Sequence, residues 1–293
     1  MGYRLPLMTR QPPSSPRPKR PETIRISKKE NRFQRAEVIK RNREKRTQYR
    51  QFLVEGVAQI SIAVKHGWQV EAFLYADDRP LSKWAQELVQ SGIARELWEL
   101  SPDLLAELSD KDETSELLAI FEAKRLTPAD ITPKEHGLIV VFDRPSSPGN
   151  LGSSIRSADA FGADGIIVTG HAVDLYDPFV VRGSMGALFA LPVATAASHT
   201  EIQDWVSQAR AQGFDYQVVG SSGKAEHLIS EQNFLRPTIL VLGNETVGMS
   251  RGYWDICDAT VKIPIGGALS SLNVSCAASI LLYEIVRQRA NNQ

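Results

Sequence analysis

The chain has 293 residues, of which 42% are hydrophobic and 23% charged, and this is the composition of a soluble globular protein with room for two domains. Its longest apolar run, about six residues near 138–142, is far shorter than the roughly 20 residues that cross a membrane. We therefore expect no membrane-spanning segment, and without an apolar secretory signal we expect a cytoplasmic protein. Cys257 and Cys276 lie far apart with no cluster of His ligands, so neither a disulfide framework nor a bound metal is expected.

The 34 basic and 34 acidic residues cancel, but they are unevenly distributed. Residues 1–50 hold 16 Lys and Arg against 4 Asp and Glu, a balance of +12, which leaves −12 on the rest of the chain. A basic arm on an acidic body favours a polyanionic partner such as nucleic acid, because each neutralised phosphate releases condensed counterions. The alternative is a solvated tail with no dedicated partner.

The N-terminal 50 residues divide into two segments. Residues 1–30 are rich in Pro, Ser and basic residues without periodicity, which predicts a disordered tail. From 31 to 50 the sequence loses proline and gains helix-forming residues, which predicts a basic helix.

Short strand-like runs then alternate with helical ones up to residue 125. The strand-like runs are FLVEG, VEAFLYA, ARELWEL and ELLAIFEA. Together with the basic helix they predict a small α/β domain over residues 31–125. Residues 126–136 contain two prolines and no strong period, and they predict a linker.

A second alternating region occupies residues 137–293. Its strand-like runs are apolar throughout and fall at 138–142, 165–169, 190–195, 216–220, 238–243 and 259–265. Apolar strands separated by helices predict a parallel sheet that is covered on both faces. In such sheets ligands bind in the loops that follow the carboxyl ends of the strands.

Two of these loops contain candidate site residues. The loop and helix over 143–162 contain Asn150 and Arg156, and the loop over 243–250 contains Glu245. Each residue also has a plain structural interpretation: Asn150 as a helix N-cap, Arg156 as the partner of an acidic residue one turn away, and Glu245 as a solvated turn residue.

The third loop reads IPIGGALSSLNVSCAASILLYE, from 263 to 284, and opens the last helix with Ser270, Ser271, Asn273 and Ser275. A helix N-cap needs only one such residue. The chain has neither GxGxxG nor GxxxxGK[ST], which argues against dinucleotide-binding and P-loop proteins. Gathered at one sheet edge, the three loops suit an uncharged or anionic substrate held by hydrogen bonds, and they lack the His or Cys nucleophile usual in hydrolases.

At these loops the sequence resembles the SpoU (TrmH) family of RNA 2'-O-ribose methyltransferases. The three family motifs resemble PGNLGSSIRSADAFGADGIIV, LVLGNETVGMS and the third loop quoted above, in order and over roughly 137–288. The resemblance implies an α/β chain with a C-terminal trefoil-knotted parallel-sheet domain that uses S-adenosylmethionine. The unit beginning at FLVEG resembles the smaller L30-like domain that binds the RNA substrate in many members.

The resemblance also implies roles for single residues. Those carried over to the methyl-transfer site are Asn150, Arg156, Glu245, Ser271 and Asn273. Those whose main chain would hold the cofactor are Gly243, Ile263 and Leu272. A guanidinium is a poor base near neutral pH, so we expect Arg156 to grip the adjacent phosphate and stabilise the forming alkoxide, with Asn150 orienting it.

Several alternatives remain open from the sequence. The substrate is ribosomal RNA by preference, because of the additional domain, with transfer RNA as the alternative. A non-catalytic RNA-binding or ribosome-assembly factor on the same fold is a further alternative, and so is a knotted methyltransferase that acts on a base nitrogen. The resemblance also implies a homodimer.

Overall fold

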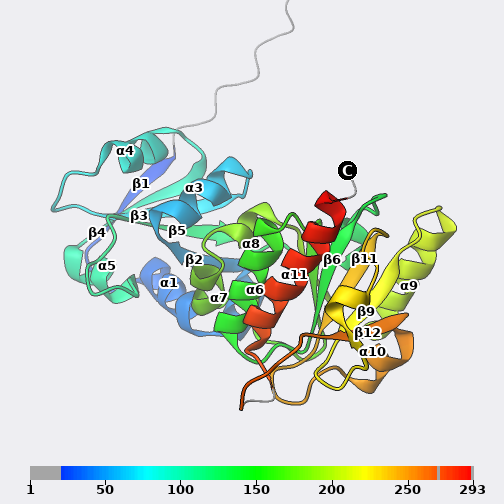
Figure 1. Cartoon of the computed structure of the whole chain (residues 1–293). Coiled ribbons are helices and arrows are strands. Elements are labelled where there is room, and N and C mark those ends of the chain that lie inside the picture. The colour runs from blue at the N-terminus through cyan, green and yellow to red at the C-terminus, as the bar shows by residue number, and fades with distance from the viewer. Residues whose placement is uncertain (1–20, 269–270, 292–293) are drawn as a thin grey trace, which may run out of the picture.

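The computed structural model describes residues 21–268 and 271–291 and contains two sheets that lie side by side (Figure 1). The N-terminal sheet has five strands in the order β1-β4-β3-β5-β2, and the C-terminal sheet has seven in the order β10-β12-β9-β11-β6-β7-β8. Within the described residues, no helix is long and apolar enough to cross a membrane.

The N-terminal sheet is mixed. β1, β4 and β3 are parallel neighbours, whereas β5 runs antiparallel to both β3 and β2. Its strands are β1 (Glu22–Ile26), β2 (Gln51–Glu55), β3 (Val70–Ala76), β4 (Ala94–Leu100) and β5 (Leu117–Glu122). Its helices are α1 (Asn31–Arg41), α2 (Arg43–Tyr49), α3 (Val57–Lys65), α4 (Lys83–Gln90) and α5 (Pro102–Leu108).

β1 corrects the prediction that residues 1–30 are disordered. The strand pairs in parallel with β4, from Glu22 opposite Glu96 to Ile26 opposite Leu100, and Ile26 is 1% exposed. The run ETIRI is too short, and too close to prolines and basic residues, to show a strand period. Residues 1–20 of the predicted tail lie outside the described residues.

The basic helix predicted over 31–50 is broken in two. At Asn42 the backbone is extended, with φ −123° and ψ 116°, and its side chain accepts a hydrogen bond from Lys45 N and so caps α2. The break lets α1 and α2 bury different kinds of side chain. α1 buries Phe33, Ala36 and Ile39, whereas α2 buries Arg46.

The seven strands of the C-terminal sheet are all parallel, as the apolar runs predicted. They are β6 (Leu138–Asp143), β7 (Gly165–Thr169), β8 (Val193–Ala196), β9 (Gln217–Ser221), β10 (His227–Leu228), β11 (Thr238–Leu242) and β12 (Ala259–Lys262). The two-residue β10 was not predicted. β8 begins later than predicted, because residues 187–190 form a helical turn.

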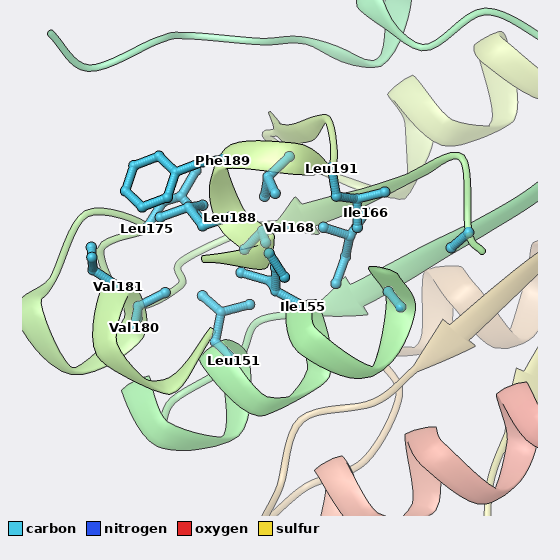
Figure 2. Close-up of a cluster of buried hydrophobic side chains, with 14 of the residues drawn as sticks. Leu151, Ile155, Ile166, Val168, Leu175, Val180, Val181, Leu188, Phe189 and Leu191 are labelled. Atoms are coloured by element: carbon cyan, nitrogen blue, oxygen red, sulfur yellow. The ribbon is translucent and has the colours of Figure 1, made fainter. Parts of the chain in front are cut away.

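Helices cover both faces of this sheet. They are α6 (Pro148–Ala160), α7 (Pro178–Gly183), α8 (Ala187–Ala190), α9 (His199–Ala211), α10 (Arg251–Ile256) and α11 (Val274–Ala290), with short 3-10 helices η1 (Pro128–Asp130) and η2 (Ile229–Glu231). Alternate β6 residues enter opposite cores: Val140 and Phe142 pack with α6 and α11, whereas Val141 packs with α9 and α10. Figure 2 shows α6 side chains meeting those of β7, α7 and α8.

One hydrophobic core continues from the C-terminal sheet into the N-terminal sheet. Phe52 of β2 lies 4.4 Å, centroid to centroid, from the ring of Tyr176, and Trp68 Nε1 donates a hydrogen bond of 2.9 Å to Phe189 O. The buried Arg46 Nε reaches Asp174 Oδ2 at 2.6 Å. Apolar packing and polar contacts therefore fix the N-terminal sheet beside the loop that leads into α7.

Candidate active site

Three loops follow the carboxyl ends of strands of the C-terminal sheet. The first joins β6 to α6, the second joins β11 to α10, and the third joins β12 to α11. β11 pairs with both β6 and β9, and β9 pairs with β12. The loops therefore open on the same edge of the sheet, which is where ligands bind in parallel α/β sheets.

Glu245 joins the second loop to the first. Its Oε2 accepts hydrogen bonds from Ser146 N at 2.9 Å and Ser146 Oγ at 2.8 Å, and its Oε1 accepts from Ser147 N at 3.0 Å and Asn150 Nδ2 at 3.3 Å. Burial raises the pKa of this carboxyl, but the hydrogen bonds lower it by more, so its pKa lies below the ordinary value. Glu245 is therefore ionised at neutral pH.

Asn273 joins the third loop to the first. Its Nδ2 donates a hydrogen bond of 2.9 Å to Asn150 Oδ1, while its Oδ1 caps α11 by accepting from Ser275 N at 2.8 Å. The Asn150 amide thus contacts Glu245 on one side and Asn273 on the other. One side chain from each loop meets in a single network, which we call the Glu245–Asn150–Asn273 network.

Asp143 and Arg144 support this network, and sequence reasoning did not select them. The buried Asp143 carboxylate accepts hydrogen bonds from the Arg144 guanidinium at 3.0 Å and from Ser250 N at 2.7 Å. Arg144 has the positive φ of 52°, and its carbonyl accepts from Asn244 Nδ2 at 2.7 Å. The only sequence signal was their position at the end of the first apolar strand of the C-terminal domain.

Arg156 and Ser271 stand apart from the network. Arg156 is exposed on α6, and its side chain makes no hydrogen bond or ion pair with any residue in 21–268 or 271–291. The predicted orienting contact from Asn150 is accordingly not seen, because the Asn150 amide is directed to Glu245 and Asn273. Ser271 is also exposed, and Ser270 lies outside the described residues.

The segment 263–268 has the properties that a cofactor site of main-chain groups requires. Its backbone N–H and C=O groups make no hydrogen bonds within the described part of the chain, and Ile263 is half-buried. An added Cβ at Gly266 or Gly267 would meet nothing within 4 Å, so a ligand can approach the backbone there. Leu272, 43% exposed, follows this segment.

Gly243 is required for the close packing of the second loop. A Cβ at this position would collide with the backbone of Gly248 and Met249, which folds back over it. The loop closes on itself through two hydrogen bonds between Asn244 and Gly248, of 3.0 and 3.1 Å. The open segment 263–268 therefore suits a ligand with several hydrogen-bonding groups, such as S-adenosylmethionine.

Comparison with known proteins identifies the family. Residues 137–283 match the SpoU rRNA methylase family, and residues 30–119 match the SpoU L30e-like domain. The chain belongs to the SpoU rRNA methylase family. Its C-terminal domain has the trefoil-knotted fold of that family, as the three motifs predicted, and an L30e-like domain precedes it.

Three relatives are similar over most of this chain. A 23S rRNA (uridine(2479)-2'-O)-methyltransferase from Streptomyces viridochromogenes is 46% identical over 278 residues, which are 93% of this chain and 95% of the relative. A 23S rRNA (guanosine-2'-O-)-methyltransferase RlmB from Pseudomonas putida is 31% identical over 73% of this chain and 77% of its own. The crystal structure of the SpoU methyltransferase AviRb from Streptomyces viridochromogenes with AdoMet has 47% identity and a TM-score of 0.85, covering 89% of this chain and 99% of that one.

Proposed function

We propose that this protein transfers the methyl group of S-adenosylmethionine to a ribose 2'-hydroxyl of 23S ribosomal RNA. The Glu245–Asn150–Asn273 network carries the proposal, because it joins the three loops of the family motifs in one structured site. The relatives named above support the choice of ribosomal RNA over transfer RNA. The enzyme class and the cofactor agree with the prediction from the motifs, and comparison with the AdoMet-bound SpoU structure confirms both. We place the reaction in the cytoplasm, where ribosomal RNA is found.

The main chain would hold the cofactor. When bound, S-adenosylmethionine supplies an electrophilic methyl group on its sulfonium sulfur. The free backbone groups of 263–268 and of Leu272 would hydrogen-bond it, and the loop closed at Gly243 would form the adjoining wall. The positions of the reacting groups matter because alignment alone contributes several kcal/mol to such a displacement, with an upper range of about 7–11 kcal/mol.

Arg156 would bind the RNA backbone. Its guanidinium has no partner in the described residues, so it is free to form two parallel hydrogen bonds with a phosphate. A guanidinium keeps its proton near neutral pH. It would therefore stabilise the forming alkoxide by charge, while the hydroxyl proton passes to the neighbouring phosphate or to water.

Ser271 and Asn273 would contact the ribose. Asn273 is held by its capping bonds at the mouth of α11, and Ser271 precedes it with an exposed hydroxyl. Asn150 and Glu245 would keep these loops in place, since the side chains of both are engaged in hydrogen bonds between loops.

The N-terminal domain and the basic arm would select and grip the RNA. The division is a small α/β domain up to about residue 125, a linker to 136 and the methyltransferase domain beyond. Residues 1–50 carry a charge balance of +12, and such charge supplies sequence-independent affinity for phosphates.

We also propose a homodimer. On α11, Ile280 is 40% exposed and Tyr283 is 57% exposed, and Leu272 before the helix is 43% exposed. Neighbouring exposed apolar side chains of this kind are typical of an interface. Light scattering is expected to give twice the mass of 32.4 kDa. A monomer that still methylates RNA would contradict the proposal.

The substrate class can be tested by methyl transfer from labelled S-adenosylmethionine to separate unmodified 23S, 16S and transfer RNA. The proposal expects label in the 23S fraction alone. Label only in transfer RNA would show that transfer RNA, and not ribosomal RNA, is the substrate. Cofactor and RNA binding without transfer to any of the three would favour a non-catalytic assembly factor.

A further inference from the structure

An exposed aromatic ring lies on α7 with a cation over it. Phe179 is 60% exposed, and the Arg182 guanidinium carbon lies 4.9 Å from the centre of its ring. Within residues 21–268 and 271–291, the Arg182 side chain makes no hydrogen bond or ion pair. The exposed part of the Phe179 ring and the charge of Arg182 are therefore available to a ligand.

The helix that carries this pair is held firmly. Val180 points toward Leu151 of α6, as Figure 2 shows, and is fully buried. Val181 is 3% exposed and faces the N-terminal domain. Asp177 caps α7 by accepting a hydrogen bond of 2.9 Å from Phe179 N. Since the inward residues fix the helix, Phe179 and Arg182 are held on its outer side without the entropy cost of ordering a loop.

α7 packs directly on the first half of α6, which carries Asn150 and Arg156. A Cβ added to Gly152 would lie 2.8 Å from Val180 O and 3.0 Å from Gly183 Cα, so the two helices touch backbone to backbone. Arg156 lies one turn beyond Gly152 on α6. The aromatic–arginine pair is therefore next to the helix that bears the proposed phosphate-binding residue.

A groove between the two domains lies beside Arg182. It is lined on one side by Arg182 and on the other by Gly56, Gln59 and Lys111 of the N-terminal domain. Val57, at the start of α3, is 57% exposed beside it. The lining also includes the acidic Glu55 and Asp110, so the groove carries both signs of charge, and Arg182 places a cation on its α7 side.

We propose that Phe179 and Arg182 form a stacking platform for an unpaired base of the RNA substrate close to the nucleotide that is methylated. The inference rests on the proposed function. Proteins recognise single-stranded RNA by stacking bases on aromatic rings and guanidinium planes, and a nearby cation also attracts the phosphate. The free positive charge of Arg182 favours a polyanionic occupant over a second copy of this chain, for which α11 offers an apolar surface instead.

The test compares Phe179→Leu with Phe179→Trp. Leucine keeps the apolar bulk but removes the ring face, whereas tryptophan keeps a stacking surface. An unmodified 23S ribosomal RNA transcript is the probe, in filter binding and in methyl-transfer kinetics. The Leu variant is expected to raise Kd and KM for RNA about 5- to 100-fold, with kcat and S-adenosylmethionine affinity within about twofold of wild type. The Trp variant and the control Leu235→Ala, an exposed apolar residue before β11, should match wild type.

Two results would overturn the platform. One is an unchanged Kd and KM in Phe179→Leu. The other is a change of oligomeric state in that variant, which would assign the surface to a protein contact. Wild-type protein that binds RNA without methylating it would contradict the proposed function and not the platform. In that case the Kd values of wild type and Phe179→Leu for RNA would still decide the role of Phe179.

Discussion

Asn150 occupies the centre of the candidate active site. Its amide oxygen accepts from Asn273 and its amide nitrogen donates to Glu245, which lie 123 and 95 positions away along the chain. Replacing Asn150 would therefore loosen two loops together. Arg156, in contrast, has no partner in the described residues and is available to the substrate.

Glu245→Gln tests the carboxylate of this network. The amide cannot accept all five hydrogen bonds that the carboxylate accepts, so we expect kcat to fall about 10- to 100-fold. Because the folded-state pKa is lowered, the carboxylate stabilises the wild type fully above the ordinary value of 4.5 and loses this effect as the pH falls through the folded-state pKa. Chemical unfolding should show a constant wild-type advantage from about pH 8 to about pH 5.5 that shrinks below it; a difference independent of pH down to the acid limit would contradict this role.

Arg156→Lys tests the proposed phosphate contact. Lysine keeps the charge but loses the planar fork that binds a phosphate through two bonds. We expect kcat to fall about 100-fold, with an unchanged S-adenosylmethionine affinity by calorimetry. Arg236→Lys, a surface change just before the amino end of β11, serves as the control. Full activity in the Arg156→Lys enzyme would show that the fork is not needed.

The sequence could select Asn150, Glu245 and Asn273 but not their contacts. Each follows a strand in a polar loop, which is a signal that one sequence carries. Their hydrogen bonds depend on how three loops approach one another, and no local pattern encodes that. Asp143 was missed for the same reason, since its partner Ser250 lies 107 positions away. Arg144 was missed because its positive φ of 52° has no sequence signature at a non-glycine residue.

At the scale of elements, the C-terminal domain was easier to predict than the N-terminal one. Its strands are buried on both faces and therefore apolar throughout, which makes them visible as runs. β1 was missed because only one of its five residues, Ile26, is buried. The break at Asn42 was missed because Asn is a weak helix breaker and no proline or glycine marks the position.

Two deletions distinguish the contribution of residues 1–20 from that of β1. Removing residues 1–20 deletes five basic residues and no acidic one, so we expect weaker RNA binding and a smaller dependence of affinity on salt. Removing residues 1–30 also deletes β1 and its pairing with β4, and should in addition lower the melting temperature. Unchanged affinity in the shorter deletion would make the tail a solvated segment without an RNA role.

At the scale of the whole molecule, the two domains are joined through Arg46. Its guanidinium contacts Asp174 at 2.6 Å and Asp177 at 3.8 Å, and also donates to Ile39 O at 2.9 Å. The side chain is only 5% exposed. This contact fixes the position of the L30e-like domain relative to the candidate active site. The sequence did not predict it, because the residues lie 128 positions apart.

Arg46→Ala should destabilise the protein strongly. The change leaves the Asp174 carboxylate half-buried without its partner, and breaking such a pair costs about 3–5 kcal/mol of unfolding free energy. Urea denaturation measures the loss. Arg25→Ala, which removes a guanidinium from a pair whose Arg side chain is 85% exposed, should cause no measurable change. An equal loss of unfolding free energy in the two variants would mean that burial does not strengthen the contact of Arg46 with Asp174.

Locating the methyl group on the RNA tests the central claim most directly. Unmodified 23S ribosomal RNA would be incubated with the enzyme and labelled S-adenosylmethionine, then hydrolysed in alkali and separated. Because a 2'-O-methyl group blocks cleavage of the adjoining phosphodiester, the label is expected in one alkali-resistant dinucleotide, and its rate of appearance is expected to fall about 100-fold in Arg156→Lys. Label recovered on a base in single nucleotides would contradict the assignment of a ribose 2'-O-methyltransferase.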